Sequence, residues 1–299
     1  MSSAKFTFFG TDEVSVVVLD TLKAYGFLPT LIVTRADRPT GRKQLLTPPL
    51  AKEWADANHI PTLQPEKFKD IEDWPSKIAG SEIAIVASYG KIIPKWVLDS
   101  FPKGVLNVHP SLLPLYRGPT PFQSALLAGE EETGVTIMVM DEEMDHGEIV
   151  QNEKCKIENT DTYTSLGDKL SKMGGEMLVE IIPKWVSGEI SPVAQDHSQA
   201  TYTRKFTSED GFIQPETVLG GATEEEVAYA DRQVRALNPE PGTFTRLKFD
   251  NQVLAGGPDD LRIKILSAKI ESGKLVPIRV VPAGKKEMLW EEFTRGNNL

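Results

Sequence analysis

The chain has 299 residues, of which 40% are hydrophobic and 25% charged, the composition of an ordinary globular protein long enough for two domains. It lacks an apolar stretch of membrane-spanning length and the apolar core of a signal peptide, so we expect a cytoplasmic protein without membrane contact. Its single cysteine, Cys155, excludes an internal disulfide and cannot form a zinc cluster by itself. The net charge of -10 argues against non-specific binding of nucleic acid.

The first half of the chain alternates strand-like and helix-like segments. The apolar run 5–9 predicts a strand, the turn at 10–12 leads into a helix, and Gly26 closes it. The residues that this spacing places on the buried face of the helix are Val14, Val17, Val18 and Leu22. Further apolar runs predict strands at 28–34, 83–87, 105–108 and 135–140. We therefore expect an α/β, Rossmann-like domain with a mostly parallel sheet. The G-x-G-x-x-G spacing is absent, which argues against a nicotinamide cofactor.

The second half predicts one long helix and then a separate small domain. Apolar residues recur at helical spacing from Tyr163 to Trp185, which predicts a helix packed along the sheet. The polar segment 190–205 is expected to be a linker between a first domain at 1–189 and a second at 206–299. A capped helix beginning at Thr223 precedes runs typical of a small β-barrel, at 244–249, 252–254, 261–270 and 275–281.

Three polar residues near the middle of the chain carry the chemical signal. Asn107 and His109 alternate with apolar neighbours, so their side chains leave the same face of a strand that Pro110 ends. Ligands of open α/β sheets bind at that carboxyl edge. An amide, an imidazole and the downstream carboxylate of Asp145 are the groups needed to move a small acyl group onto an amine. A lone Asn or His at a strand end is more often structural, so the context must decide.

The context is a series of motifs that keep one order along nearly the whole chain. They lie at 107–114, 117–123, 133–138 and 145–147 in the middle, at 36–42 and 46–49 upstream, and at 234–239 and 284–288 near the end. The central motifs resemble the core of the folate-dependent formyltransferases. The upstream and late motifs resemble the methionyl-tRNA formyltransferases within that family.

The resemblance implies a reaction and a set of site residues. The reaction is transfer of the formyl group of 10-formyltetrahydrofolate to the α-amino group of methionyl initiator tRNA, in translation initiation and without a metal. Asn107 and a protonated His109 would stabilise the oxyanion, and Asp145 would hold the imidazole. The group that removes the amine proton stays open. The implied folate-binding residues are Ser88, Tyr89, Gly90, Ile92, Ser111, Leu112, Leu113, Pro114 and Asp141.

The resemblance also implies that the second domain is an OB-like barrel that helps to hold tRNA. An OB-fold needs five strands and only about four are evident, so we expect an abbreviated barrel. The basic residues implied for tRNA binding are Arg38, Arg42, Lys43, Lys285 and Lys286. The expected partners are initiator methionyl-tRNA and a small-molecule folate, with the chain acting as a monomer.

Three other functions fit parts of the sequence. An N-formyltransferase acting on an amino-sugar nucleotide would share the three catalytic residues, but the loop 37–42 and the block 284–286 argue against it. A hydrolase would use water in place of the amine, and an assay for formate without an acceptor would detect it. A nucleic-acid-binding module without catalysis would use only the barrel, and loss of activity in His109→Ala would exclude it.

Overall fold

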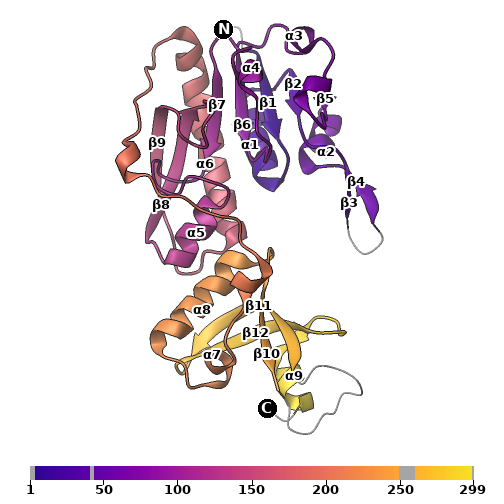
Figure 1. The fold of residues 1–299 in the computed structure, drawn as a ribbon, viewed down its shortest axis with the longest axis vertical. Coiled ribbons are helices and arrows are strands. Elements are labelled where there is room, and N and C mark those ends of the chain that lie inside the picture. The colour runs from indigo at the N-terminus through magenta and orange to yellow at the C-terminus, as the bar shows by residue number, and fades with distance from the viewer. Residues whose placement is uncertain (1–3, 41–43, 249–259, 298–299) are drawn as a thin grey trace. The chain divides into compact units, whose positions relative to one another are not determined.

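The computed structural model describes residues 4–40, 44–248 and 260–297, and the chain divides into two units (Figure 1). Unit 1 comprises Met1–Pro121, Glu132–Lys156 and Leu166–Thr203, and unit 2 comprises Phe122–Glu131, Ile157–Ser165 and Arg204–Leu299. Unit 1 is an α/β domain with a mostly parallel sheet, and unit 2 contains an antiparallel sheet. The predicted Rossmann-like domain with a mostly parallel sheet is confirmed. The small second domain, predicted to be an OB-like β-barrel, contains an antiparallel sheet, and closure of that sheet into a barrel stays a prediction.

Unit 1 is built on a seven-stranded sheet whose strand direction changes after the fifth strand in the order. The order is β5 (Thr62–Leu63), β2 (Leu31–Val33), β1 (Phe6–Gly10), β6 (Ile83–Ala87), β7 (Val105–His109), β8 (Glu132–Val139) and β9 (Ile149–Lys156). The strands from β5 to β7 are parallel, whereas β8 and β9 are antiparallel to their neighbours. The edge strand β9 was not predicted, because most of its residues are polar, half of them are exposed, and they form no apolar run.

The first helix, α1 (Glu13–Ala24), begins at the predicted turn, where the Asp12 carboxylate accepts a hydrogen bond from the Ser15 N–H. Its buried face differs from the predicted one and comprises Ser15, Val18, Leu19 and Leu22. The Ser15 hydroxyl donates to the Ala87 carbonyl at the end of β6, 2.7 Å away. A polar residue can occupy the buried face because its hydroxyl finds this partner, and no hydrophobicity pattern records that.

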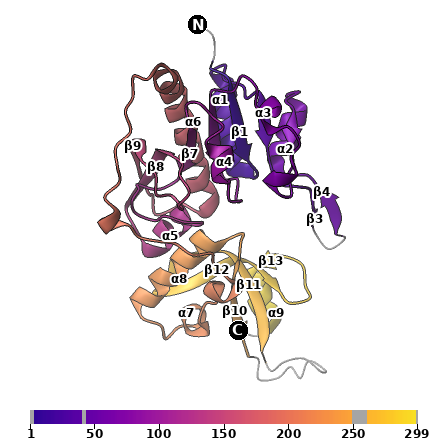
Figure 2. The ribbon, with the colours of Figure 1, turned by 45° about the horizontal axis from the view of Figure 1, so that its top comes forward.

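The remaining helices of unit 1 are α2 (Leu50–Ala57), α3 (Trp74–Lys77), α4 (Lys95–Leu98) and most of α6 (Tyr163–Ser187). The predicted long helix is therefore confirmed in α6. A Cβ atom on Gly174 would lie only 2.4 Å from Val108 Cγ1, so glycine allows α6 to approach β7 this closely (Figure 2). A separate hairpin, β3 (Arg38–Thr40) and β4 (Leu45–Thr47), carries exposed side chains.

An aromatic cluster forms part of the core of unit 1 near the ends of β1 and β6. The Phe9 ring lies 5.5 Å from the Tyr89 ring, edge to face, and 6.2 Å from Phe68, which is in the 3-10 helix η1 (Phe68–Asp70). Trp74 and Phe101 complete the cluster. This packing anchors the loop that leaves β6, because Tyr89 belongs to that loop.

Unit 2 contains a four-stranded antiparallel sheet within residues 204–248 and 260–297. Its strands are β10 (Thr243–Leu247), β11 (Leu261–Glu271), β12 (Lys274–Pro282) and β13 (Met288–Leu289). Its helices are α7 (Pro215–Leu219), α8 (Glu224–Leu237), α9 (Trp290–Asn297) and most of α5 (Pro121–Ala128), with the 3-10 helix η3 (Ser208–Gly211). The predicted strand at 252–254 lies outside the described residues, and β13 was not predicted because two residues are too few for a periodic pattern.

The unit boundaries differ from the predicted domains 1–189 and 206–299. Most of the expected linker 190–205 belongs to unit 1, where Val193 and Ile149 exchange backbone hydrogen bonds of 2.8 Å. Two earlier segments join unit 2, and the Arg235 guanidinium there donates to the Asp161 carbonyl at 2.9 Å. Composition marks polar segments as linkers, but hydrogen bonds between distant segments decide which unit they join. No helix in the described parts of the chain is long and apolar enough to cross a membrane.

Candidate active site

His109 is the last residue of β7 and Asn107 lies two residues before it, on the strand where the parallel part of the sheet meets the antiparallel part. Asn107 pairs with Val86 of β6 on one side and with Met138 of β8 on the other. Both side chains leave the same face of the strand because one residue separates them. Asn107 is half-buried, whereas only 4% of His109 is exposed.

The structure brings Asp145 to His109. His109 Nδ1 lies 3.6 Å from Asp145 Oδ1, and Asp145 Oδ2 accepts a hydrogen bond of 2.7 Å from the Gly118 N–H. Asp145 has a φ of 53°, in the left-handed region that is strained for a residue with a side chain. A strained residue held by specific contacts is a frequent feature of functional sites.

The surroundings of His109 favour the neutral imidazole. Burial lowers the pKa of His109 below its ordinary value of 6.5, and the charge of Asp145 and the Tyr116 carbonyl oppose this shift without reversing it. His109 Nε2 lies 3.1 Å from the Tyr116 carbonyl oxygen, which can only accept, so Nε2 carries a hydrogen. Nδ1 is then the basic nitrogen of the neutral ring. The sequence had suggested a protonated His109, because it does not reveal how deeply the ring is buried.

The loop after β6 lies next along the same edge of the sheet. Ser88 has a φ of 48°, and its hydroxyl donates to the Asp12 carboxylate. Arg35 supports the loop from outside, since its guanidinium donates to the Tyr89 carbonyl at 3.1 Å and to the Gly90 carbonyl at 2.5 Å. Burial raises the pKa of the Asp12 carboxyl.

The residues implied for folate binding differ in their solvent exposure. Tyr89, Ser111 and Leu113 are buried, and burial raises the pKa of the Tyr89 hydroxyl to about 12. The Ser111 hydroxyl donates to the Leu115 carbonyl at 2.7 Å. These three side chains therefore pack or hydrogen-bond inside unit 1. Side chains or backbone reach the surface at the other implied positions, which are Ser88, Gly90, Ile92, Leu112, Pro114 and Asp141.

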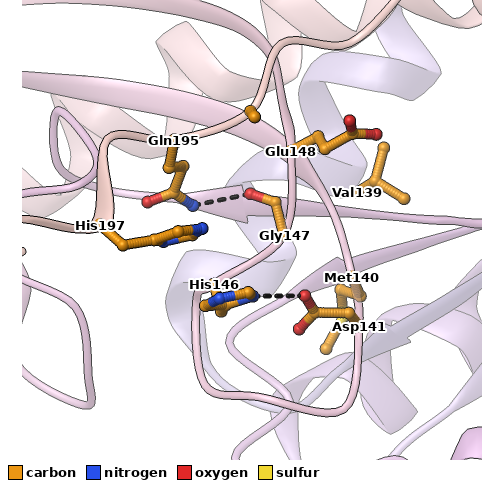
Figure 3. Close-up of a pocket in the computed structure, with 9 residues that line it drawn as sticks. Val139, Met140, Asp141, His146, Gly147, Glu148, Gln195 and His197 are labelled. Carbon is orange, nitrogen blue, oxygen red and sulfur yellow. Dashed lines mark hydrogen bonds and ion pairs between the residues drawn. The ribbon is translucent and has the colours of Figure 1, made fainter.

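A small cavity of about 230 Å³ is lined in part by His146 and Gly147, the two residues that follow Asp145 in the chain (Figure 3). Its lining includes Asp141, His146 and Gln195, together with His197 from the 3-10 helix η2 (His197–Gln199). His146 Nδ1 lies 2.7 Å from Asp141 Oδ2. The rings of His146 and His197 stack with centroids 4.0 Å apart.

The sequence did not single out two buried residues in this region, Arg117 and Gln195. The Arg117 guanidinium donates to Gln195 Oε1 at 2.7 Å, and the Gln195 amide donates to the carbonyls of Asp145 and Gly147. Arg117 belongs to one of the recognised motifs, so the motif was the available signal. Gln195 lay in the expected linker and carried no signal.

The basic residues implied for tRNA binding are spread over the chain. Arg38 is exposed on β3 of unit 1, and Arg42 and Lys43 lie outside the described residues. Lys285 and Lys286 are exposed between β12 and β13 of unit 2.

Sequence comparison relates this chain to known proteins over almost its full length. A family model described as formyl transferase matches residues 5–182. The methionyl-tRNA formyltransferase of Bacillus velezensis is 37% identical, and the match covers 99% of this chain and 95% of the relative. That of Chloroflexus aurantiacus is 41% identical over 81% of this chain and 76% of the relative.

Solved structures share the fold. A methionyl-tRNA formyltransferase from Clostridium thermocellum matches with a TM-score of 0.55 and 16% identity, covering 96% of this chain and 99% of that one. A sugar N-formyltransferase from a Shewanella species matches with a TM-score of 0.61 and 15% identity, covering 90% and 99%. At these identities the structural likeness bears on the fold alone, whereas the sequence relatives define the family. The chain belongs to the formyl transferase family and, within it, to the methionyl-tRNA formyltransferases.

Proposed function

We propose that this protein transfers the formyl group of 10-formyltetrahydrofolate to the α-amino group of methionyl initiator tRNA, in translation initiation. The observation that carries the proposal is the meeting of Asn107, His109 and Asp145 at one sheet edge, in a chain related over its length to methionyl-tRNA formyltransferases. All three groups come from one chain, so a monomer is sufficient for the chemistry.

Asn107 supplies the donor for the oxygen that becomes negative. When the amine attacks the formyl carbon, a carbon–nitrogen bond forms and the carbonyl oxygen takes up charge. The half-buried amide of Asn107 can donate hydrogen atoms to that oxygen at the strand end, where little reorganisation is needed. The bond to N10 of the folate then breaks, and the formyl group stays on the amine.

The His109–Asp145 pair takes up the proton that the attacking amine releases. Neutral His109 has a basic Nδ1, and Asp145 Oδ1 lies 3.6 Å from it. The imidazolium that forms is stabilised by this carboxylate, and the proton passes on to the departing N10, so that the reaction is balanced. A neutral resting histidine therefore suits a base better than it suits a permanent oxyanion donor.

The loops around this centre are the proposed folate site. The loop Ser88–Gly90, with exposed Ile92, forms one wall, and Leu112, Pro114 and Asp141 contribute from the other side. Tyr89, Ser111 and Leu113 shape these walls from within, because their side chains are buried. For tRNA, the proposed contacts are the basic residues Arg38, Arg42, Lys43, Lys285 and Lys286.

An acceptor assay tests the proposal. The protein is incubated with 10-formyltetrahydrofolate and methionyl initiator tRNA, methionyl elongator tRNA, an amino-sugar nucleotide or no acceptor. We expect formylation of the initiator tRNA. Asn107→Ala should lower turnover by about 100-fold, the scale of losing one oxyanion donor, whereas the exposed Asn152→Ala on β9 should not.

Each of the other outcomes would assign a different function to this protein. Formylated sugar nucleotide without formylated tRNA would make the chain a sugar N-formyltransferase, which shares the fold with this chain. Formate released equally with and without acceptor would indicate a hydrolase. Binding of tRNA without any product would indicate a module that has lost catalysis.

A further inference from the structure

We propose that Arg117 and Gln195 are positioning residues that hold Asp145 in its place beside His109. The inference rests on the proposed function, because it assigns Asp145 to the reacting centre. Asp145 has a φ of 53° and follows Met144, which is 59% exposed. Neither the local backbone preference nor burial of its neighbour would keep it there, so the position depends on hydrogen bonds from elsewhere.

Gln195 binds the backbone on both sides of His146. Its Nε2 donates to the Asp145 carbonyl at 3.0 Å and to the Gly147 carbonyl at 2.7 Å, and the second contact is visible in Figure 3. Gln195 is only 6% exposed, so water does not replace these donors readily. An amide is the neutral side chain that offers two donors and an acceptor from one end, and all three are used here.

Arg117 holds Gln195 in turn. Its Nη2 donates to Gln195 Oε1 at 2.7 Å and to His197 Nδ1 at 2.8 Å, and its Nη1 donates to the Tyr202 hydroxyl at 3.2 Å. Arg117 is 2% exposed, and within the described residues no carboxylate lies at ion-pair distance from it. A buried cation held only by neutral partners is costly to maintain, which points to a positioning task rather than a contribution to stability.

Arg117 also acts through its own backbone. Its N–H donates to the Thr201 carbonyl, and its carbonyl accepts from the Thr203 N–H at 2.7 Å. The next residue, Gly118, donates its N–H to the Asp145 carboxylate at 2.7 Å. The Gln195 amide therefore holds the Asp145 carbonyl, and the Gly118 N–H holds the Asp145 carboxylate. Both donors depend on Arg117 for their positions.

Gln195→Met tests this arrangement, because methionine has a similar length and neither donor nor acceptor of comparable strength. We expect kcat to fall by about 10- to 100-fold, the scale of a small misplacement of a reacting group, with unchanged KM for folate and tRNA. Gln195→Glu keeps the contact to Arg117 but turns an acceptor toward two carbonyls, so it should show the same defect. The matched control is Gln199→Met, because the Gln199 amide donates to Asp196 at the surface and to no other described residue.

A double substitution separates positioning from a general structural effect. In an Asp145→Asn background, Gln195→Met should cost little more, because both changes act through the same carboxylate. If the two losses multiply, or if Gln195→Met keeps the kcat of the folded wild type, the positioning inference is overturned.

A titration of His109 gives a readout that does not need turnover. The chain has four histidines, and His109→Gln identifies the His109 signal in an NMR titration. Because Asp145 raises the pKa of His109, displacing Asp145 through Gln195→Met should lower that pKa, as Asp145→Asn does. An unchanged pKa would refute the inference. A wild-type chain that formylates no acceptor would refute the proposed function instead, and this titration would still decide the positioning.

Discussion

The residue pair His109 and Asp145 sets the pH behaviour that we expect of this enzyme. His109 is buried, and its environment favours the neutral ring, while the Asp145 carboxylate pulls in the opposite direction. The base is therefore available in its reactive form at neutral pH. The interaction between the Asp145 carboxylate and the ring is most favourable after the ring has taken up a proton. His109 is therefore neutral before the reaction, and the imidazolium that it forms during the reaction is stabilised by Asp145.

Asp145→Asn should move the acid limb of the kcat/KM profile to lower pH. The substitution removes the charge that raises the pKa of His109, so this pKa falls further below 6.5. The maximum of kcat should fall as well, because the imidazolium formed in the reaction loses its partner. A profile measured between acid and neutral pH checks both effects, and an acid limb displaced toward higher pH would contradict the pairing.

The lowered pKa of His109 also makes the stability of the folded chain depend on pH. The pKa of His109 in the folded chain lies below its unfolded value, so acidification favours the unfolded state, which binds the proton more readily. The stability connected with neutral His109 is present above pH 6.5 and is lost as the pH falls toward the folded pKa. The Asp145→Asn variant should lose more of this stability at acid pH, because the pKa of His109 in its folded state is lower still.

At the scale of elements, β7 is the strand on which the site depends. It is the last parallel strand, and it pairs with the antiparallel β8 on its other side. The carboxyl end of β7 therefore lies beside the end of β6 and the loop that carries Ser88, while the chain after β8 supplies Asp145. Gly174 lets α6 pack closely on Val108 between the two site residues of the strand.

Helix α8 illustrates how local sequence stabilises an element of unit 2. The Thr223 hydroxyl accepts from the Glu226 N–H at 3.3 Å, and the Glu226 carboxylate accepts from the Thr223 N–H at 2.7 Å. The Thr223 N–H and hydroxyl both donate to the Glu226 carboxylate and lower its pKa. Helix α8 buries Val227 and Val234 in the core of unit 2.

Thr223→Ala should lower the free energy of unfolding by about 1 kcal/mol, because one end of α8 loses its cap. Thr223→Ser keeps the hydroxyl and should retain most of the stability. Hydrogen exchange of the α8 amides, together with denaturant unfolding, measures the difference. Equal protection in Thr223→Ala and the wild type would show that the cap contributes nothing.

For the whole molecule, the net charge of -10 makes tRNA binding depend on local basic residues. Arg38 lies exposed on β3 of the β3–β4 hairpin. Salt weakens contacts between such cations and phosphates, so the salt dependence of binding reports how many contacts form.

Arg38→Ala should weaken tRNA binding and reduce the slope of log affinity against log salt concentration by about one phosphate contact. The affinity for folate should not change. Lys77→Ala on α3 is the matched control, because Lys77 is an exposed cation outside the proposed contacts. If both variants keep the wild-type slope, Arg38 is not a tRNA contact, and the hairpin has another role.

Local patterns were sufficient for much of this protein. The strands at 83–87 and 105–108, the helix from Tyr163 and the capped helix α8 depend on contiguous apolar runs, helical spacing and caps, all of which can be read from neighbouring residues. The alternation around Asn107 and His109, followed by Pro110, placed these residues at a strand end for the same reason. Motif order then identified the family.

Tertiary structure decided what depends on burial and on distant partners. The neutral state of His109 follows from the packing around it, and Gln195 reaches Asp145 across 50 positions of sequence. The polar strand β9 forms because β8 offers it an edge, and segments 122–131 and 157–165 join unit 2 through contacts with residues beyond 204. None of these features has a local signal, because each depends on which groups the folded chain brings together and removes from water.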